Sequence, residues 1–344
     1  MTMAATPAAR PQTAVPAVRK WPGVNLHVVS GKGGTGKTTL AAALALALAQ
    51  DGRRTLLIEV EGRQGIAQLF DCPPLPYEER KVAVAPGGGE VWALAVDAQE
   101  ALLDYLESFY NLRRAGTALK KMGAVDFATT VAPGLRDVLL TGKAVEVVRR
   151  KEKQSPDAYD AVVLDAPPTG RIAKFLNVNS EVSGLAKAGP IRKHADIVMK
   201  VIASPQTLVH LVTLLEEMPV QETIDGIADL EDNHLPVGSV MVNMTRPPLL
   251  SDAHLRMAEN DTLPAAAIAA NLVQAGLATH VDEIVTALRH EATDHAQRIA
   301  LEHRELRRIE DLNLPTFLLP LLPGGIDLGG LYELSEILTD AGVG

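Results

Sequence analysis

The amino-acid sequence predicts an α/β fold: a doubly wound, mostly parallel β-sheet into which a helical subdomain is inserted. Two observations lead to this prediction. Short runs rich in β-branched and aliphatic residues, typical of buried strands, alternate with helical stretches along the chain. A glycine-rich loop joins the first of these strands to the first helix. Such sheets carry helices on both faces and bind ligands at the carboxyl ends of their strands.

Composition and charge exclude several classes of protein. The length of 344 residues suits two domains or one large domain with an insertion. Hydrophobic residues make up 47% and charged residues 22%, so the chain is expected to fold and to be neither disordered nor a membrane bundle. The net charge of -9 argues against a duplex-DNA binder, and we expect no nucleic-acid partner. The longest apolar run, residues 40–49, is about half as long as a bilayer crossing, so we expect no direct membrane insertion.

Cys72 is the only cysteine in the sequence. One cysteine can form neither a disulfide within the chain nor a Cys-x-x-Cys metal site, so the sequence predicts a cytoplasmic protein without structural zinc. Residues 1–23 carry alanine, proline and a few basic residues but no continuous apolar segment, and they predict a disordered tail. The folded domain is therefore expected over residues 24–344.

The elements follow in order from residue 24. The first strand (24–30) leads through the glycine-rich loop into a buried helix (38–50), which should end at Asp51-Gly52. The helical subdomain is expected at about 97–157 and 171–203, where apolar residues recur at helical spacing. Further strand candidates lie at 54–61, 91–96, 159–165, 207–214, 237–243 and 316–319, and a long charged helix at about 282–311.

Residues 31–38, GKGGTGKT, satisfy the pattern G-x-x-x-x-G-K-S/T between a strand and a helix, the context that a phosphate-binding loop requires. Glycines let backbone N–H groups turn toward the phosphates, Lys37 places a charge on the outer phosphates, and the Thr38 hydroxyl is suited to bind Mg²⁺. The sequence therefore predicts a site for ATP and Mg²⁺. The nucleotide-binding residues expected from this loop are Gly31, Gly33, Gly34, Thr35, Gly36, Lys37, Thr38 and Thr39.

Lys32, directly after the first glycine, narrows the class of protein. With this lysine, the loop resembles the deviant phosphate-binding loop (deviant Walker A) of dimerising ATPases. These include the arsenite-pump and tail-anchored-protein targeting ATPases, the partitioning and division-site ATPases, and the nitrogenase iron protein. In that class the early lysine typically reaches across the dimer to the partner's nucleotide. The resemblance therefore implies a dimer and a catalytic role for Lys32.

Asp165 to Arg171, DAPPTGR, follows the fourth strand and resembles the D-x-x-P-T-G-H second switch of the arsenite-pump and tail-anchor targeting ATPases. An aspartate at the end of a buried strand is where a second magnesium contact is needed, here expected through water. Asn243 matches the family's adenine-contacting asparagine, and Pro320 with Pro323 resembles its proline-bracketed loop beside the base. These matches run in chain order over nearly the whole sequence, so the chain is identified as a member of this family.

The first switch departs from the family pattern. Relatives carry D-P-A-H, whereas this chain reads EGRQ at residues 61–64. Glu61 keeps the carboxylate that is expected to place the attacking water but adds a methylene, and a displacement of about 1 Å can cost about 100-fold in rate. Gln64 is a second candidate for orienting that water. We therefore expect slow or partner-dependent hydrolysis, or a switch that has kept only binding.

The single cysteine also bears on metals and partners. Eukaryotic tail-anchor targeting proteins hold their dimer with a Cys-x-x-Cys zinc site, and arsenite pumps bind metalloid through cysteines, so neither zinc nor metalloid is expected with Cys72 alone. The resemblance implies that the helical subdomain binds a hydrophobic-helix or membrane-protein client, although amphipathic helices are more often core. A homodimer and a heterodimer with a homologous ATPase chain both remain open.

Other functions compete with the ATPase interpretation. One is a nucleotide-dependent binding or regulatory subunit with little or no hydrolysis. Another is a partitioning or division-site ATPase, but that needs a basic surface or a C-terminal amphipathic membrane helix, and the chain ends in a short acidic segment. A role like that of the nitrogenase iron protein fails because a 4Fe-4S cluster shared across a homodimer needs two cysteines per chain.

Overall fold

The computed structural model describes residues 21–110, 133–178, 190–277 and 279–343. An eight-stranded sheet lies at its centre in the order β3-β4-β2-β5-β1-β6-β7-β8, and every neighbouring pair is parallel except β3 with β4. This arrangement confirms the predicted fold class. The strands are β1 (Leu26–Gly31), β2 (Arg54–Glu59), β3 (Arg80–Val84), β4 (Glu90–Ala95), β5 (Ala161–Asp165), β6 (Thr207–Thr213), β7 (Val237–Thr245) and β8 (Thr316–Pro320).

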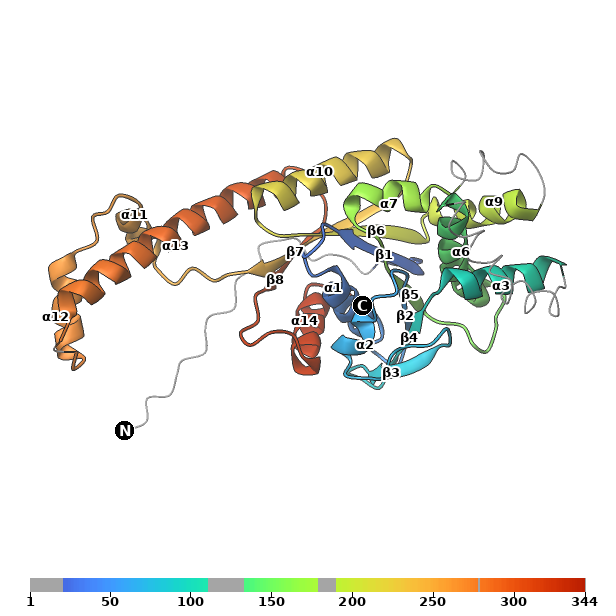
Figure 1. The fold of residues 1–344 in the computed structure, drawn as a ribbon, viewed down its shortest axis with the longest axis horizontal. Coiled ribbons are helices and arrows are strands. Elements are labelled where there is room, and N and C mark those ends of the chain that lie inside the picture. Colours follow the sequence, from blue (N-terminus) through green and yellow to red (C-terminus); the bar gives the residue numbers. More distant parts are fainter. Residues whose placement is uncertain (1–20, 111–132, 179–189, 278, 344) are drawn as a thin grey trace.

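Helices cover both faces of the sheet (Figure 1). One face packs against α1, α2 and α14, and the other against α3, α6, α7, α9 and α10. The described helices are α1 (Lys37–Leu48), α2 (Gly65–Leu69), α3 (Ala98–Tyr110), α6 (Pro133–Glu152), α7 (Thr169–Leu176), α9 (Pro190–Ile202), α10 (Glu217–Asp232), α11 (Asp252–Glu259), α12 (Ala265–Gln274), α13 (Val281–Glu310) and α14 (Leu328–Asp340).

The central strands could be predicted from the sequence because they are buried on both faces of the sheet. All six residues of β1 and all five of β5 are buried, as strands covered on both faces must be. Helix α1 is buried from Leu40 to Leu48 because it lies against the sheet under α14 and α2. The chain then turns at Asp51 and Gly52, both with positive φ, where the sequence predicted the helix to end.

One strand was missed. β3 is an edge strand that pairs only with β4, in antiparallel direction, and none of its five residues is fully buried. Its sequence, RKVAV, begins with two charges and lacks the continuous apolar run of an inner strand. The long charged helix predicted at about 282–311 is present as α13.

The helical layer beside the sheet contains α3, α6, α7 and α9. Helices α3, α6 and α9 fall within the segments predicted for the helical subdomain, and α7 begins two residues before the second segment. Tyr105 of α3 is buried and meets the His194 ring of α9 edge-on, with 5.4 Å between ring centroids. It is therefore part of the core. Residues 111–132 and 179–189, which belong to the segments predicted for the helical subdomain, lie outside the described residues, so client binding there stays a prediction.

Residues 1–20 of the expected tail also lie outside the described residues. Trp21, which the sequence analysis placed in that tail, packs at the amino ends of the central strands. Its ring lies 4.6 Å from that of His210 and 5.3 Å from that of His27, centroid to centroid. The packed domain therefore begins before residue 24, because Trp21 covers two buried histidines.

At the end of the molecule far from α3, α6 and α9, helices α11 and α12 and the first half of α13 project away from the sheet (Figure 1). Helix α12 has no buried residue, although its sequence is AAAIAANLVQ. A small cluster that includes Leu255, Ala258, Ala296 and Ile299 joins α11 to α13. None of the described helices is both long and apolar enough to cross a membrane.

Candidate functional site

The glycine-rich loop connects β1, which lies between β5 and β6, to α1. Gly34 and Gly36 have φ values of 88° and 87°, so both need glycine. A Cβ on Gly31 would lie 2.3 Å from the Val212 carbonyl oxygen, which shows how closely the loop passes β6. Gly33 has open space around its Cα. The conformation of the loop therefore requires glycine at positions 31, 34 and 36.

Hydrogen bonds within the loop hold it in place. The Thr35 hydroxyl donates to the Lys32 carbonyl oxygen at 2.8 Å, and the Asn243 side-chain nitrogen donates to the Thr35 carbonyl oxygen at 2.9 Å. A Cβ on Gly36 would lie 2.3 Å from that Asn243 nitrogen. Asn243 thus braces the loop from the end of β7, a role that sequence reasoning missed. Its contact with adenine stays a prediction.

Lys37 and Thr38 open α1 below the loop. Lys37 is 9% exposed, while Thr38 and Thr39 are half-buried. The Thr38 hydroxyl donates to Oδ2 of Asp165, at the end of β5, at 2.7 Å. The structure therefore brings together the two residues that the sequence assigned to magnesium, although 127 positions separate them.

The other oxygen of Asp165 supports its assignment. Oδ1 is buried and has no hydrogen-bond partner among the described residues, so it is free to accept from a water molecule on a cation held by Thr38. Burial raises the pKa of Asp165 to about 6, opposed by the Thr38 hydrogen bond and the Lys37 charge. The described residues include no group of three or more His, Cys, Asp or Glu side chains that could hold a metal ion directly. The site thus fits a magnesium ion bound by Thr38 and by phosphate, with Asp165 acting through water.

Glu59 is a second buried carboxylate at this edge of the sheet, and the sequence analysis did not identify it. It is 2% exposed and pairs in register with Asp165 across β2 and β5. Its Oε2 accepts a hydrogen bond from the Ile66 backbone N–H at 3.3 Å, whereas Oε1 has no partner. The feature of the sequence that could have identified it is a charged residue at the end of the mostly apolar run TLLIE.

The first switch lies beside these carboxylates. The Glu61 side chain is 25% exposed and its Oε2 lies 3.6 Å from the Arg63 Nε. Glu61 also lines an open cavity of about 530 Å³ between the switch and the helical layer, together with Arg136, Asp137 and Arg171. Burial is the main cause of the raised pKa of Asp165, and the negative charges of Glu59 and Glu61 add to it.

Gln64 is engaged in a contact that the sequence did not predict. Its amide nitrogen donates to the Leu75 carbonyl oxygen at 3.1 Å, and its amide oxygen accepts from the Leu75 N–H at 2.7 Å. The next residue, Gly65, lies against Thr38, because a Cβ there would be 3.2 Å from the Thr38 methyl carbon. Gln64 therefore ties the first switch to residue 75, and its action on a water molecule stays a prediction.

Lys32 and the two prolines lie at the periphery. The Lys32 Nζ is 2.6 Å from Oε1 of Glu222 on α10, and both side chains are about one-third exposed. Pro320 ends β8 beside Thr245 of β7 and is half-buried, whereas Pro323 is exposed. Lys32 thus has an acidic partner within its own chain, which the sequence did not reveal. Its reach to a second subunit, and the contact of the prolines with a base, stay predictions.

A glycine loop between a central parallel strand and a buried helix, ending in lysine and threonine, is the arrangement that proteins use to hold the phosphates of a nucleotide. The fold and this site define a protein of the α/β nucleoside-triphosphatase class. Residues 24–204 match the family model described as anion-transporting ATPase. The chain belongs to that family.

Relatives support this membership along the whole chain. The sequence is 53% identical to ATPase BagA of Mycobacterium tuberculosis over 327 residues, which cover 94% of this chain and 96% of the relative. It is 29% identical to ATPase GET3 of Kluyveromyces lactis over 163 residues, or 46% of each chain. With ATPase ARSA1 of Chlamydomonas reinhardtii it shares 24% identity over 300 residues, or 71% of this chain and 38% of that one.

Proposed function

We propose that this protein is a cytoplasmic, dimeric ATPase that binds MgATP at the glycine loop and couples its nucleotide state to the helical layer. The observation that carries the proposal is the Thr38–Asp165 hydrogen bond beside the buried Lys37. A hydroxyl and a carboxylate at this spacing, next to a buried cation, suit a magnesium-bound triphosphate. Family membership and the ATPase names of the relatives support the same activity.

The residues divide the chemistry among them. Loop N–H groups and Lys37 bind the phosphates, Thr38 holds Mg²⁺, and Asp165 orients water on the ion. Mg²⁺, when bound, neutralises charge on the phosphates as the terminal bond breaks. Glu61 would orient the attacking water, and Lys32 would leave Glu222 to reach the nucleotide of a second subunit. Because the only cysteine is Cys72, we propose no metalloid transport and no zinc-held dimer.

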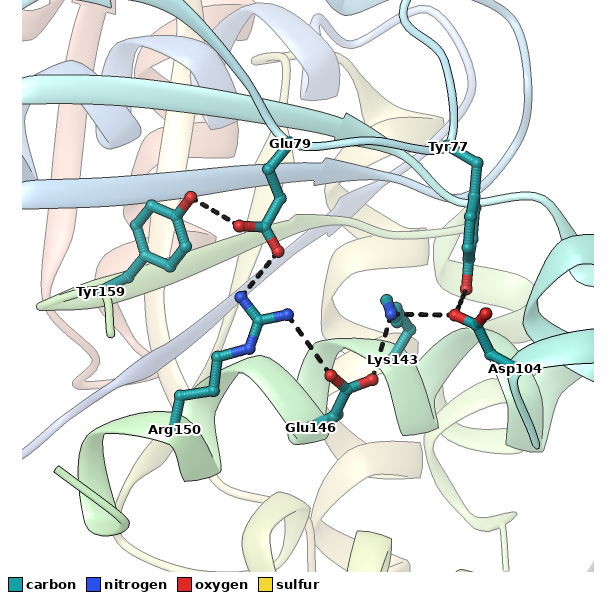
Figure 2. A network of polar contacts seen from close by, with 7 residues as sticks. All are labelled: Tyr77, Glu79, Asp104, Lys143, Glu146, Arg150 and Tyr159. Atoms are coloured by element: carbon teal, nitrogen blue, oxygen red, sulfur yellow. Dashed lines mark hydrogen bonds and ion pairs between the residues drawn. The ribbon is translucent and has the colours of Figure 1, made fainter. Parts of the chain in front are cut away.

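A chain of contacts runs from the site to the helical layer and supports the coupling. It starts at Gln64, whose amide holds the backbone of residue 75. Two residues further on, the Tyr77 hydroxyl donates to Asp104 of α3 at 2.8 Å (Figure 2). Lys143 of α6 binds the same Asp104 oxygen at 3.1 Å, and its ammonium lies 5.3 Å from the centre of the Tyr77 ring.

The segment that carries Tyr77 contacts α6 at a second place, through Glu79. Glu79 accepts from Arg150 of α6 and from the Tyr159 hydroxyl, each at 2.8 Å. Glu146 lies between the two cations and pairs with both Lys143 and Arg150 (Figure 2). The side chains of Glu79, Lys143 and Arg150 are less than a quarter exposed, whereas those of Asp104 and Glu146 are about half exposed. A movement of the first switch would therefore pull on two turns of α6 through charged contacts.

A nucleotide-dependent regulatory subunit is the second candidate. It is favoured by the first switch, where Glu61 faces Arg63 and both polar ends of the Gln64 amide are bound to the chain. In such a subunit the switch would respond to bound nucleotide without placing a water molecule. A homologous partner chain would then supply the turnover.

The test is nucleotide binding and ATP hydrolysis by the purified protein, with Lys37→Ala as the inactive variant and Lys174→Ala, a lysine of α7, as a surface control. We expect turnover that Lys37→Ala abolishes and Lys174→Ala leaves intact. If the protein binds nucleotide but does not hydrolyse it, even under single-turnover conditions, the result favours the regulatory subunit. Absence of nucleotide binding by the wild-type protein refutes both functions.

A further inference from the structure

Glu59 has an environment that ordinary packing does not explain. The side chain is buried at the end of β2, and none of the arginine, lysine or histidine side chains that the structure describes forms an ion pair with it. An unpaired carboxylate in such a place is costly, because its charge loses hydration without compensation. Its neighbour in register is Asp165, another buried carboxylate, which places two negative charges on adjacent strands.

Each of these two carboxylates uses one oxygen and leaves the other without a partner. Asp165 accepts from the Thr38 hydroxyl through Oδ2, and Glu59 accepts from the Ile66 N–H through Oε2. Oδ1 of Asp165 and Oε1 of Glu59 have no hydrogen-bond partner among the described residues. Buried acceptors that lack partners are rare in folded proteins and call for a cation, a water molecule or a proton.

The surroundings place Glu59 at the magnesium position. Ile66, whose N–H it holds, follows Gly65, and Gly65 packs directly against Thr38. Burial is the main cause of the raised pKa of Asp165, and the charge of Glu59 adds to it. Glu59, Thr38 and Asp165 therefore surround one point at the carboxyl ends of β2 and β5 and the start of α1.

We propose that Glu59 is a positioning residue for the divalent cation, and that its free oxygen and that of Asp165 together accept hydrogen bonds from the water ligands of Mg²⁺. This inference rests on the proposed nucleotide site and adds to it a second carboxylate. A hydrated cation satisfies both free oxygens and compensates both charges at once. It also explains why a glutamate is tolerated in the apolar strand.

The competing explanation is purely structural: Glu59 could serve only to hold the first N–H groups of the short helix α2. Two substitutions separate these roles. Glu59→Gln keeps an acceptor of the same length for the Ile66 N–H but removes the charge. Glu59→Asp keeps the charge but shortens the reach to that N–H by one methylene. Glu305→Gln, at a buried glutamate of α13 that is paired with arginine, controls for loss of a buried charge.

The measurement is calorimetric binding of the non-hydrolysable β,γ-imido analogue of ATP, once in EDTA and once with saturating MgCl₂. We expect Glu59→Gln to bind the analogue in EDTA at least as well as the wild-type protein. The gain in affinity on adding Mg²⁺ should fall on the order of tenfold, as for other residues that hold metal-bound water. Glu59→Asp should retain most of the gain, and Glu305→Gln all of it.

The opposite ranking overturns the inference. If Glu59→Gln keeps the full gain from Mg²⁺ while Glu59→Asp loses affinity in both conditions, Glu59 only anchors α2. A wild-type protein that binds the analogue with no gain from Mg²⁺ refutes the inference together with the magnesium site of the proposed function, but leaves nucleotide binding by the glycine loop standing. A wild-type protein that does not bind the analogue at all refutes the proposed function as well. Thermal melting of each variant in EDTA confirms that it is folded before binding is measured.

Discussion

The buried histidine pair beneath Trp21 predicts that the fold loses stability in mild acid. Nδ1 of His27 lies 3.1 Å from Nε2 of His210, and Nδ1 of His210 lies 2.7 Å from the Ser239 hydroxyl. The two rings are stacked, with 11° between their planes. Burial lowers the pKa of His27 to about 3, and burial together with the His27 charge lowers that of His210 well below its ordinary value.

The sign and size of the effect follow from the difference in proton binding between the folded and unfolded chains. Above pH 6.5 both states are neutral at these rings, and stability is complete. Below pH 6.5 the unfolded chain binds a proton that the folded chain refuses, so stability falls, for His27 down to about pH 3. At pH 5 the loss from His27 is about 2 kcal/mol, or about 1.36 kcal/mol per pH unit. His210 adds a loss of the same sign.

The assay is urea unfolding at pH 7.5 and pH 5, followed by tryptophan fluorescence, because Trp21 lies directly on the pair. His27→Gln removes one titrating ring, so the loss between the two pH values should be smaller by about 2 kcal/mol than in the wild-type protein. His290→Gln, at an exposed histidine of α13, should leave the loss unchanged. Equal losses in wild type and His27→Gln would refute the reasoning.

Three further predictions concern the candidate site. Glu61→Asp should raise single-turnover hydrolysis, by up to about 100-fold, at unchanged nucleotide affinity; an unchanged rate would contradict a water-placing role. Gly36→Ala should weaken nucleotide binding by about tenfold or more in calorimetry because its Cβ would collide with Asn243, whereas Gly33→Ala, in open space, should bind more nearly normally. Lys143→Met should abolish the nucleotide-dependent change in hydrogen exchange of α3 and α6, while nucleotide binding persists. The loss of its ion pairs should lower the stability of the fold by about 1 kcal/mol. If the exchange response is retained, this route of coupling is excluded.

The inner strands, the glycine loop and the long helix were predictable because one local pattern determines each. β1 and β5 are continuous apolar runs buried on both faces, and the loop needs glycine where φ is positive. The Thr38–Asp165 contact also followed from position, since both residues end elements that converge at the same edge of the sheet. In these cases the local sequence pattern is sufficient to predict the structure.

The remaining features depend on contacts between distant segments. The bonds of Asn243 to Thr35, of Gln64 to Leu75 and of Lys32 to Glu222 join residues between 11 and 208 positions apart. No periodicity or motif marks their partners. Edge strand β3 was missed for a related reason: solvent covers most of it, so its sequence needs no apolar run.

The charges around Thr38 bear on which form of the nucleotide the site accepts. The negative charges of Glu59 and Glu61 raise the pKa of Asp165 beyond the effect of burial, and the Lys37 charge opposes this rise. A triphosphate without a metal would bring further negative charge to this cluster, whereas its magnesium complex brings a cation between the phosphates and the carboxylates. Buried charges at the ends of β2 and β5 reduce the stability of the fold alone and are compensated when that cation binds. We therefore expect the buried carboxylates of β2 and β5 to make the proposed site selective for the magnesium complex over the free nucleotide.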